Sequence, residues 1–168
     1  RTRAAAEAGT LSITVGADAA TLAAIRPILD CCAEEITHCG PVGAGQVVKQ
    51  MNNMVLFQTV VALCEALAIG RAAGVDGAVL FEALTKGSAD SFALRNHGMK
   101  AVLPDAFPER AFSTEYALKD LSYALDLAAQ SGIVPRGAEI AREYLTRAAE
   151  AGHGKLYWPV IARTITTT

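Results

Sequence analysis

Lys49 and Asn53 are the residues of this 168-residue chain whose types and spacing best suit chemistry. Side chains four residues apart on a helix share a face, so an amine and an amide would lie side by side there. The following run, Met54 to Cys64, is almost entirely apolar and carries no formal charge. Desolvation beside such a run favours the neutral amine, which can then accept and return a proton near neutral pH. Alternatively, Lys49 extends into solvent from a helix end and Asn53 is a surface amide.

The run from Gly40 to Asn53, GPVGAGQVVKQMNN, resembles the catalytic-lysine motif of the β-hydroxyacid dehydrogenase family. This family includes 3-hydroxyisobutyrate dehydrogenase, tartronate semialdehyde reductase and glyoxylate/succinic semialdehyde reductases. The resemblance continues through GTLSITVG at residues 9–16, and through Phe112 and the sequence KDL at residues 119–121. It therefore spans nearly the whole chain.

The resemblance implies an oxidoreductase that interconverts a small hydroxy acid and its semialdehyde or oxo acid with NAD or NADP. Lys49 would be the general acid/base, and Asn53 would hydrogen-bond the substrate. Phe112 and Asp120 would border the substrate, and Lys119 would contact the cofactor. No metal ion is implied, because a lysine and an amide can together stabilise a developing alkoxide.

Each of the later residues also has a plain structural interpretation. Phe112 could be a core aromatic, and Lys119 with Asp120 an exposed pair near the start of a helix. Ser91, which the resemblance places at a substrate-proximal turn, could equally be a helix cap. His97 and His153 are isolated in turn-like segments, so we expect them to face solvent without a role. Trp158 is expected to anchor packing.

No G-x-G-x-x-G run, the phosphate-binding fingerprint of dinucleotide-binding domains, occurs in these residues. Gly43-Ala44-Gly45 lacks the third glycine, and Gln46 excludes a P-loop. We therefore expect the C-terminal part of a dehydrogenase without most of its NAD(P)-binding domain. Such a chain should by itself be inactive and bind NAD(P) poorly.

Composition narrows the possible partners and the compartment. A net charge of −2 with scattered basic residues offers no footprint for nucleic acid. The apolar run from Met54 to Cys64 is shorter than the roughly 20 residues that cross a bilayer, so no membrane partner is expected. The start of the chain lacks an apolar leader, which favours the cytoplasm, or the mitochondrial matrix in a eukaryote. The four cysteines match no zinc spacing and are expected to be reduced thiols.

The first forty residues predict a strand, a helix and a second strand. Leu11–Val15 alternates with period two, and Asp18 can cap a helix over 19–32 that carries Leu22, Ile25, Ile28 and Leu29 on one face. Residues 35–39 predict the second strand. We interpret residues 1–40 as the C-terminal remnant of a Rossmann domain.

Residues 41–168 predict an all-helical substrate and dimerisation domain, which makes the fold mainly α. It should be built on one long helix over 43–73, apolar on nearly all sides and therefore buried, ending at Gly74. Asp76 should cap the next helix, with Val79, Leu80 and Leu84 inward. Further helices are expected over 89–96, 114–130, 136–151 and 157–163, and residues 164–168 should fray.

The apolar circumference of the long helix predicts a homodimer or higher homo-oligomer, because soluble monomers rarely expose large apolar patches. Val55, Leu56, Val60 and Leu63 are expected among the buried positions. The same feature supports the alternative function, a non-catalytic helical dimerisation module or an inactive truncated chain.

Overall fold

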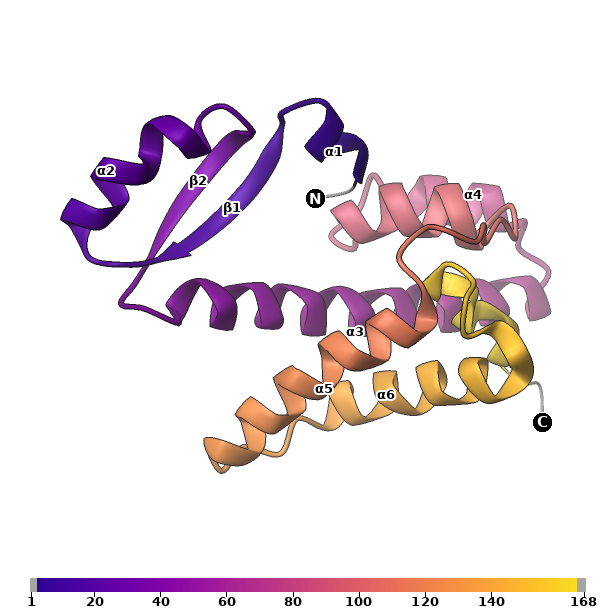
Figure 1. The fold of residues 1–168 in the computed structure, drawn as a ribbon. Helices are drawn as coiled ribbons and strands as arrows, with labels where there is room; N and C mark the ends of the chain where they lie inside the picture. Colours follow the sequence, from indigo (N-terminus) through magenta and orange to yellow (C-terminus); the bar gives the residue numbers. More distant parts are fainter. Residues whose placement is uncertain (1–2, 166–168) are drawn as a thin grey trace. The chain divides into compact units, whose positions relative to one another are not determined.

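The structure, a computed structural model, describes residues 3–165 and consists mainly of helices with one pair of parallel strands (Figure 1). The chain divides into two compact units inside helix α3 (Ala44–Ala72), the first ending at Asn52 and the second beginning at Asn53. The position that the sequence suggested as a boundary, Gly40/Pro41, lies at the end of strand β2 (Ala33–Gly40). Each unit is described by itself below.

The first unit contains a short helix α1 (Arg3–Glu7) and a strand–helix–strand segment. Strand β1 (Leu11–Gly16) pairs in parallel with β2, and Thr14 lies opposite Thr37. Helix α2 (Ala19–Leu29) connects the two strands and lies along one side of them (Figure 1). The Asp18 carboxylate caps α2 by accepting hydrogen bonds from the amide and hydroxyl of Thr21 at 2.9 and 2.7 Å.

Helix α2 ends at Leu29, so the expectation of a helix to residue 32 is wrong. The N–H of Leu11 donates to the carbonyl of Cys32, and β2 begins at Ala33. The chain must therefore turn over residues 30–32 to enter the sheet. The apolar face expected on α2 is covered only in part within this unit: Leu22 is buried, whereas Ile25 and Ile28 are exposed.

Two glycines let the start of α3 approach the end of β1. A Cβ atom at Gly45 would lie 2.5 Å from the carbonyl oxygen of Thr14, and one at Gly16 would lie 2.5 Å from the carbonyl oxygen of Pro41. The Thr14 hydroxyl also donates to the carbonyl of Gly45 across 2.9 Å. The glycine-rich turn is thus explained by close backbone packing that no larger residue permits.

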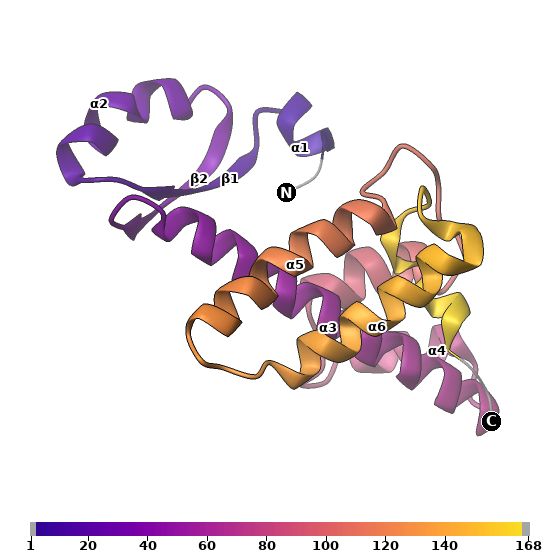
Figure 2. The same ribbon diagram turned by 60° about the horizontal axis from the view of Figure 1, so that its bottom comes forward.

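The second unit is a group of helices around the part of α3 that follows Asn52. Helix α4 (Gly77–Leu84) lies on one side of α3, and helices α5 (Thr114–Gln130) and α6 (Arg136–Ala148) lie on the other (Figure 1). Figure 2 shows α5 and α6 running side by side in opposite directions. The largest fully buried side chains fill the space between these helices: Trp158, Phe57, Phe81, Leu94, Leu121 and Leu145.

Helix α3 is less buried than its sequence predicted. Val60 and Leu63 are buried, as expected, but Val55 is 58% exposed and Ile69 is 69% exposed in this chain. One layer of neighbours covers only part of a helix that is apolar on most sides. With 29 residues, α3 is also long and apolar enough to cross a membrane by length and composition, although the shorter run considered from sequence is not. A single helix of this kind is weak evidence of a membrane span, and one third of its most apolar stretch is buried in this chain.

The end of α3 and the start of α4 follow the expected chemistry. Gly74 has a φ of +85°, and the next amide, Val75 N–H, donates to the Gly70 carbonyl, which closes the helix. The Asp76 carboxylate caps α4 by accepting from the amides of Ala78 and Val79. Of the three residues expected inward, Val79 is wrong, since it is 60% exposed. Leu80 and Leu84 are half-buried, and Leu80 lies against Gly70 of α3. The fully buried position is Phe81. Phe81 lies against Gly98, where a Cβ would come within 3.2 Å of the ring.

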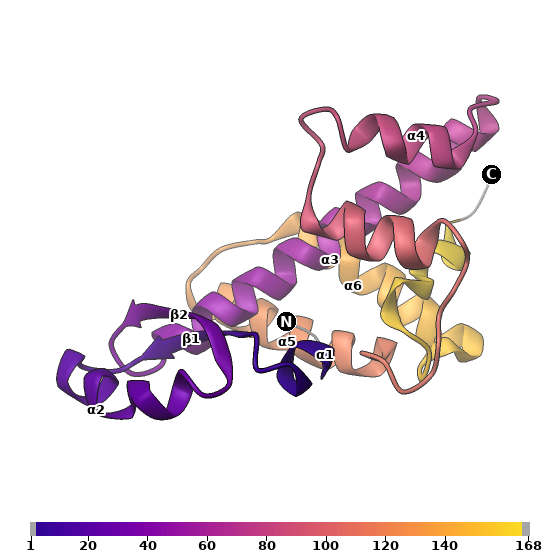
Figure 3. The same ribbon diagram turned by 90° about the horizontal axis from the view of Figure 1, so that it is seen from above.

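Several of the remaining helices differ from the sequence expectation in their type and in their bounds. The helix expected over 89–96 begins at Phe92 and continues as a π-helix, η1 (Leu94–Val102), beside α3 (Figure 3). Helix α6 also passes into a π-helical turn, η2 (Ala149–His153), and the chain ends in a 3₁₀-helix, η3 (Trp158–Thr164). Hydrophobic spacing does not distinguish these variants from an α-helix, since they differ by about one residue per turn. Of residues 164–168, which were expected to fray, Thr164 instead belongs to η3, so that expectation is wrong there. Residues 166–168 lie outside the described residues.

Candidate functional site

Lys49 and Asn53 both lie on α3, one helical turn apart, as their spacing predicted. Lys49 is exposed, and Asn53 is half-buried. Asn53 precedes the fully buried Phe57 by one further turn, so it lies where the buried face of α3 becomes polar. This position allows its amide to be held by a neighbouring helix.

Helix α5 supplies the group that holds it. The Ser113 hydroxyl caps this helix by accepting a hydrogen bond from the Tyr116 amide. The negative charge of Glu115 in the first turn interacts favourably with the positive end of the helix dipole. Three residues at helical spacing, Ala117, Leu121 and Ala124, are fully buried. Asp120 lies on this same face and is itself buried, with 10% of its side chain exposed. A carboxylate in an apolar seam requires partners.

Asp120 has a partner on each carboxylate oxygen. The side-chain nitrogen of Asn53, Nδ2, donates to Oδ2 across 2.9 Å. The ammonium of Lys119 lies 3.3 Å from Oδ1. Asn53 and the adjacent pair Lys119 and Asp120, which the sequence singled out separately, are thus brought together around one carboxylate.

Lys119 also lies against two aromatic rings that the sequence analysis did not select. Its Nζ atom is 4.9 Å from the centre of the Tyr116 ring and 5.8 Å from that of Tyr123. The three residues follow the i, i+3 and i+7 spacing of one helix face, which is a signal that sequence alone contains. Half of the lysine side chain is exposed, so its ammonium remains accessible from solvent.

Phe112 is a half-buried member of the aromatic core of this unit. Its ring centre lies 6.1 Å from that of Phe57, which in turn meets Trp158 edge-on at 4.8 Å. The Trp158 amide donates to the Phe112 carbonyl across 3.0 Å, which joins the two segments. Trp158 is therefore the packing anchor that its sequence suggested.

Ser91 is placed as a helix cap. Its hydroxyl oxygen accepts from the amide of Leu94 across 3.1 Å, as an N-cap does. The structural interpretation of Ser91 thus has direct geometric support.

His97 corrects the sequence analysis, which placed it in solvent. It is buried, and its Nδ1 lies 2.6 Å from the Tyr157 hydroxyl oxygen. Its ring also packs on Trp158 and Phe92. Burial lowers the pKa of His97 to about 4 and raises that of Tyr157 to about 12. The turn-like segment around His97 is a π-helix packed in the core, and this packing hides the ring.

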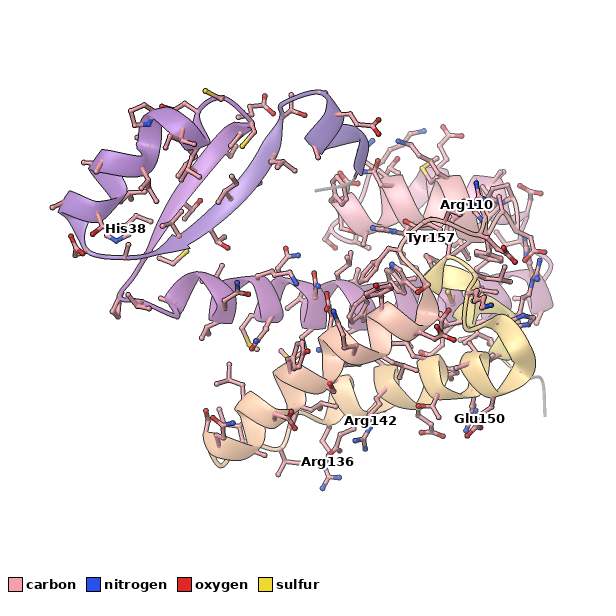
Figure 4. The ribbon with its side chains drawn as sticks, viewed as in Figure 1. His38, Arg110, Arg136, Arg142, Glu150 and Tyr157 are labelled. Carbon is pink, nitrogen blue, oxygen red and sulfur yellow. The ribbon has the colours of Figure 1, made fainter. Side chains whose placement is uncertain are left out.

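The outer face of α6 and of the turn that follows it carries charged side chains. Arg136, Arg142 and Glu150 point away from the helices (Figure 4).

Among residues 3–165, no group of three or more histidine, cysteine, aspartate or glutamate side chains could hold a metal ion. Cys31, Cys32, Cys39 and Cys64 are free thiols, and burial raises the pKa of Cys64 to about 12.

A family model described as "NAD-binding of NADP-dependent 3-hydroxyisobutyrate dehydrogenase" matches residues 43–158. A Mycobacterium bovis protein named "Probable 3-hydroxyisobutyrate dehydrogenase" is 33% identical over 95% of this chain and 56% of its own length. The 3-hydroxyisobutyrate dehydrogenase of Pseudomonas aeruginosa is 38% identical over 87% of this chain and 51% of its own.

A solved structure of Mycobacterium tuberculosis 3-hydroxyisobutyrate dehydrogenase with L-serine has the same fold. It superposes with a TM-score of 0.89 at 30% identity, over 98% of this chain and 58% of the other. The chain therefore spans just over half the length of the relatives that it matches.

Proposed function

Because this chain belongs to the family of the NAD-binding domain of NADP-dependent 3-hydroxyisobutyrate dehydrogenase, we propose that it serves NAD(P)-dependent interconversion of a small hydroxy acid and its semialdehyde or oxo acid. The protein that contains this chain would be the oxidoreductase. The 168 residues would supply the acid/base lysine, the orienting amide and a cofactor contact.

Lys49 is the proposed proton-transfer group. In the oxidation, its neutral amine takes the proton of the substrate hydroxyl as the carbonyl forms. In the reduction, its ammonium returns a proton to the oxygen. An exposed lysine on the first turns of α3 can reach a bound substrate, and closure of the site around it would supply the desolvation that favours the neutral form.

Asn53 is the proposed orienting group. Its amide would hydrogen-bond the reacting oxygen and hold the substrate next to Lys49, since the two residues share a helix face. The hydrogen bond from Asn53 to the buried Asp120 supports this role, because a restrained amide loses little freedom when the substrate binds.

NAD or NADP, when bound, accepts or supplies the hydride. Lys119 is the proposed contact, and its accessible ammonium fits a carbonyl or phosphate oxygen. The Asp120 carboxylate and two aromatic faces already neutralise part of its charge. A neutral carboxamide oxygen is therefore a better match than a phosphate.

Asp120 is proposed to lie next to the substrate, since it contacts Asn53 directly. Phe112, whose ring centre lies 6.1 Å from that of the buried Phe57, would supply an apolar wall of the substrate site. We place Ser91 at the periphery of the substrate region, where its cap fixes the start of the helix that leads into η1.

The observation that carries this function is the hydrogen bond from Asn53 to Asp120, together with the ion pair of Asp120 and Lys119, at positions that resemble the family motif. The test is the rate of NADH or NADPH formation by the natural protein containing this chain, with 3-hydroxyisobutyrate and L-serine as first substrates. Turnover that requires Lys49 but survives Lys155→Ala, at an exposed lysine, would support the proposal. No turnover with either cofactor across a panel of small hydroxy acids would contradict it.

Homodimer formation is part of the proposal. The exposed apolar residues of α3, Val55 and Ile69 among them, suit contact with a second copy. The same residues would serve a module that only dimerises, and the variants at Lys49 separate the two functions, because a dimerisation module has no use for the amine.

A further inference from the structure

We propose that the outer face of α6 is an interface between copies of this chain, in which two α6 helices pack antiparallel about a two-fold axis. This inference goes beyond the proposed function and does not depend on it. It starts from the order of the charged residues along the helix and the turn that follows it.

The outer face of α6 is open to solvent, whereas the opposite face is packed in the core. Ala138, Ala141 and Leu145 are fully buried on the packed side. On the open side the side chain of Arg136 is 84% exposed, and Glu150 is exposed in η2. Both residues point away from the helices in Figure 4. A second molecule can therefore contact this face without any rearrangement of the core.

The charges on the open side make the helix complementary to a reversed copy of itself. In chain order they alternate in sign: Arg136, Glu139, Arg142, Glu143, Arg147 and Glu150. In an antiparallel pair centred on the middle of this series, Arg136 lies opposite Glu150 of the second copy. Glu139 then lies opposite Arg147, and the two central residues, which differ in sign, meet beside the axis. A parallel two-fold pair would instead place each charge against itself, so the pattern favours the antiparallel arrangement.

Contacts within the helix already orient these side chains. Arg136 lies 3.4 Å from Glu139, and Arg147 donates a hydrogen bond to Glu143. Such exposed pairs stabilise a single helix only slightly. In the antiparallel pair the same side chains would form a network across the interface, in which each charge has neighbours from both copies.

The same arrangement covers apolar side chains that this chain leaves exposed. Ile140 is exposed on the outer side of α6, and Ile133 and Val134 are exposed just before the helix begins. In the reversed copy, Val134 lies opposite Gly152, which has a φ of +86° and no atom within 4 Å of the position of a Cβ. An apolar side chain can therefore pack on bare backbone there. This burial adds the apolar contribution that ion pairs in water do not supply.

The α6 interface would be distinct from the contact expected through the exposed residues of α3. A chain with two different two-fold interfaces assembles as a tetramer. The two contacts should also differ in their response to salt, because the Debye length falls from about 10 Å at 0.1 M to about 3 Å at 1 M. High salt should therefore release the α6 contact and leave the apolar α3 contact intact.

Charge reversal tests the pairing directly, with light scattering after size exclusion on the natural protein that contains this chain. Arg136→Glu and Glu150→Arg should each halve the mass, because each places like charges opposite one another. Mixing the two variants, or combining both changes in one chain, should restore the mass, since opposite charges then face each other again. Lys86→Glu is the matched control, because it makes the same change of charge at an exposed position on α4.

A mass that both single substitutions leave unchanged would overturn the proposal, as would a monomeric unsubstituted protein. So would a loss of mass that neither the mixture nor the double variant restores, or one that Lys86→Glu causes equally. Circular dichroism of each variant shows whether the helices remain folded. None of these measurements uses enzymatic activity, so a failure of the proposed function would leave this result readable.

Discussion

The Tyr157 hydroxyl and the His97 imidazole share a partly buried hydrogen bond of 2.6 Å that joins η1 to the start of η3. The two residues are sixty positions apart in sequence, and both rings also contact Trp158. The bond therefore connects the end of the chain to the helical core.

His97 predicts a specific pH dependence of stability. Its folded pKa of about 4 lies below the ordinary 6.5, so the folded state favours the neutral ring. Stability is complete above pH 6.5 and falls as the pH drops from 6.5 towards 4, because only the unfolded chain takes up the proton readily. The total loss is on the order of 3 kcal/mol.

Urea unfolding at pH 7.5 and pH 5.0 measures this loss, and His97→Gln should remove most of the difference between the two. A proton NMR titration locates the residue responsible. A His97 ring that titrates near pH 6.5 in the folded protein would contradict the prediction.

Lys49→Ala should lower kcat of the natural protein by roughly 10²- to 10⁴-fold, the usual contribution of a general acid/base. Lys49 is exposed on α3, so the protein should keep its helical circular dichroism spectrum. Lys155→Ala serves as the control in the same assay. Unchanged kcat at saturating substrate would remove Lys49 from the mechanism.

Asn53→Ala should both raise KM and lower kcat, because an orienting hydrogen bond acts in the ground state and in the transition state. It also removes the hydrogen bond that Asn53 donates to the buried Asp120, which should cost about 1–3 kcal/mol of folding stability. Steady-state kinetics and thermal unfolding of the same preparation test both effects. A changed KM with an intact kcat would limit Asn53 to ground-state binding.

The 168-residue chain by itself should bind NADH and NADPH weakly and should not turn over hydroxy acids. The physical reason is that a dinucleotide is held largely through its pyrophosphate, and no G-x-G-x-x-G turn occurs in this sequence. Calorimetric titration with each cofactor measures the affinity. Micromolar binding would show that contacts such as Lys119 are sufficient by themselves.

The chain should be at least dimeric in solution through the exposed apolar residues of α3. Light scattering after size exclusion should give a mass of at least twice 17.5 kDa at low micromolar concentration. Val55→Glu should shift this mass towards the monomer, whereas Val79→Glu, at an equally exposed valine on α4, should not. A folded monomer in the unsubstituted chain would show that α3 needs no second copy.

The elements of this protein follow largely from local sequence signals. Alternation in Leu11–Val15 defined β1, and the capping residues Asp18 and Asp76 and the αL glycine at Gly74 set helix ends that the structure reproduces. Helix α5 has the bounds that its pattern predicted, Thr114–Gln130. These signals succeed because caps, turns and periodicity depend on residues within a few positions of one another.

Contacts between segments distant in sequence were decided only by the tertiary structure. The spacing of Lys49 and Asn53 could be read directly, but the bond between Asn53 and Asp120, sixty-seven residues apart, depends on how α3 packs on α5. His97 was misplaced for the same reason, since its burial comes from Tyr157 and Trp158 rather than from its neighbours. The exposed side of α3 likewise follows from how many helices pack around it, a quantity that its own composition does not contain.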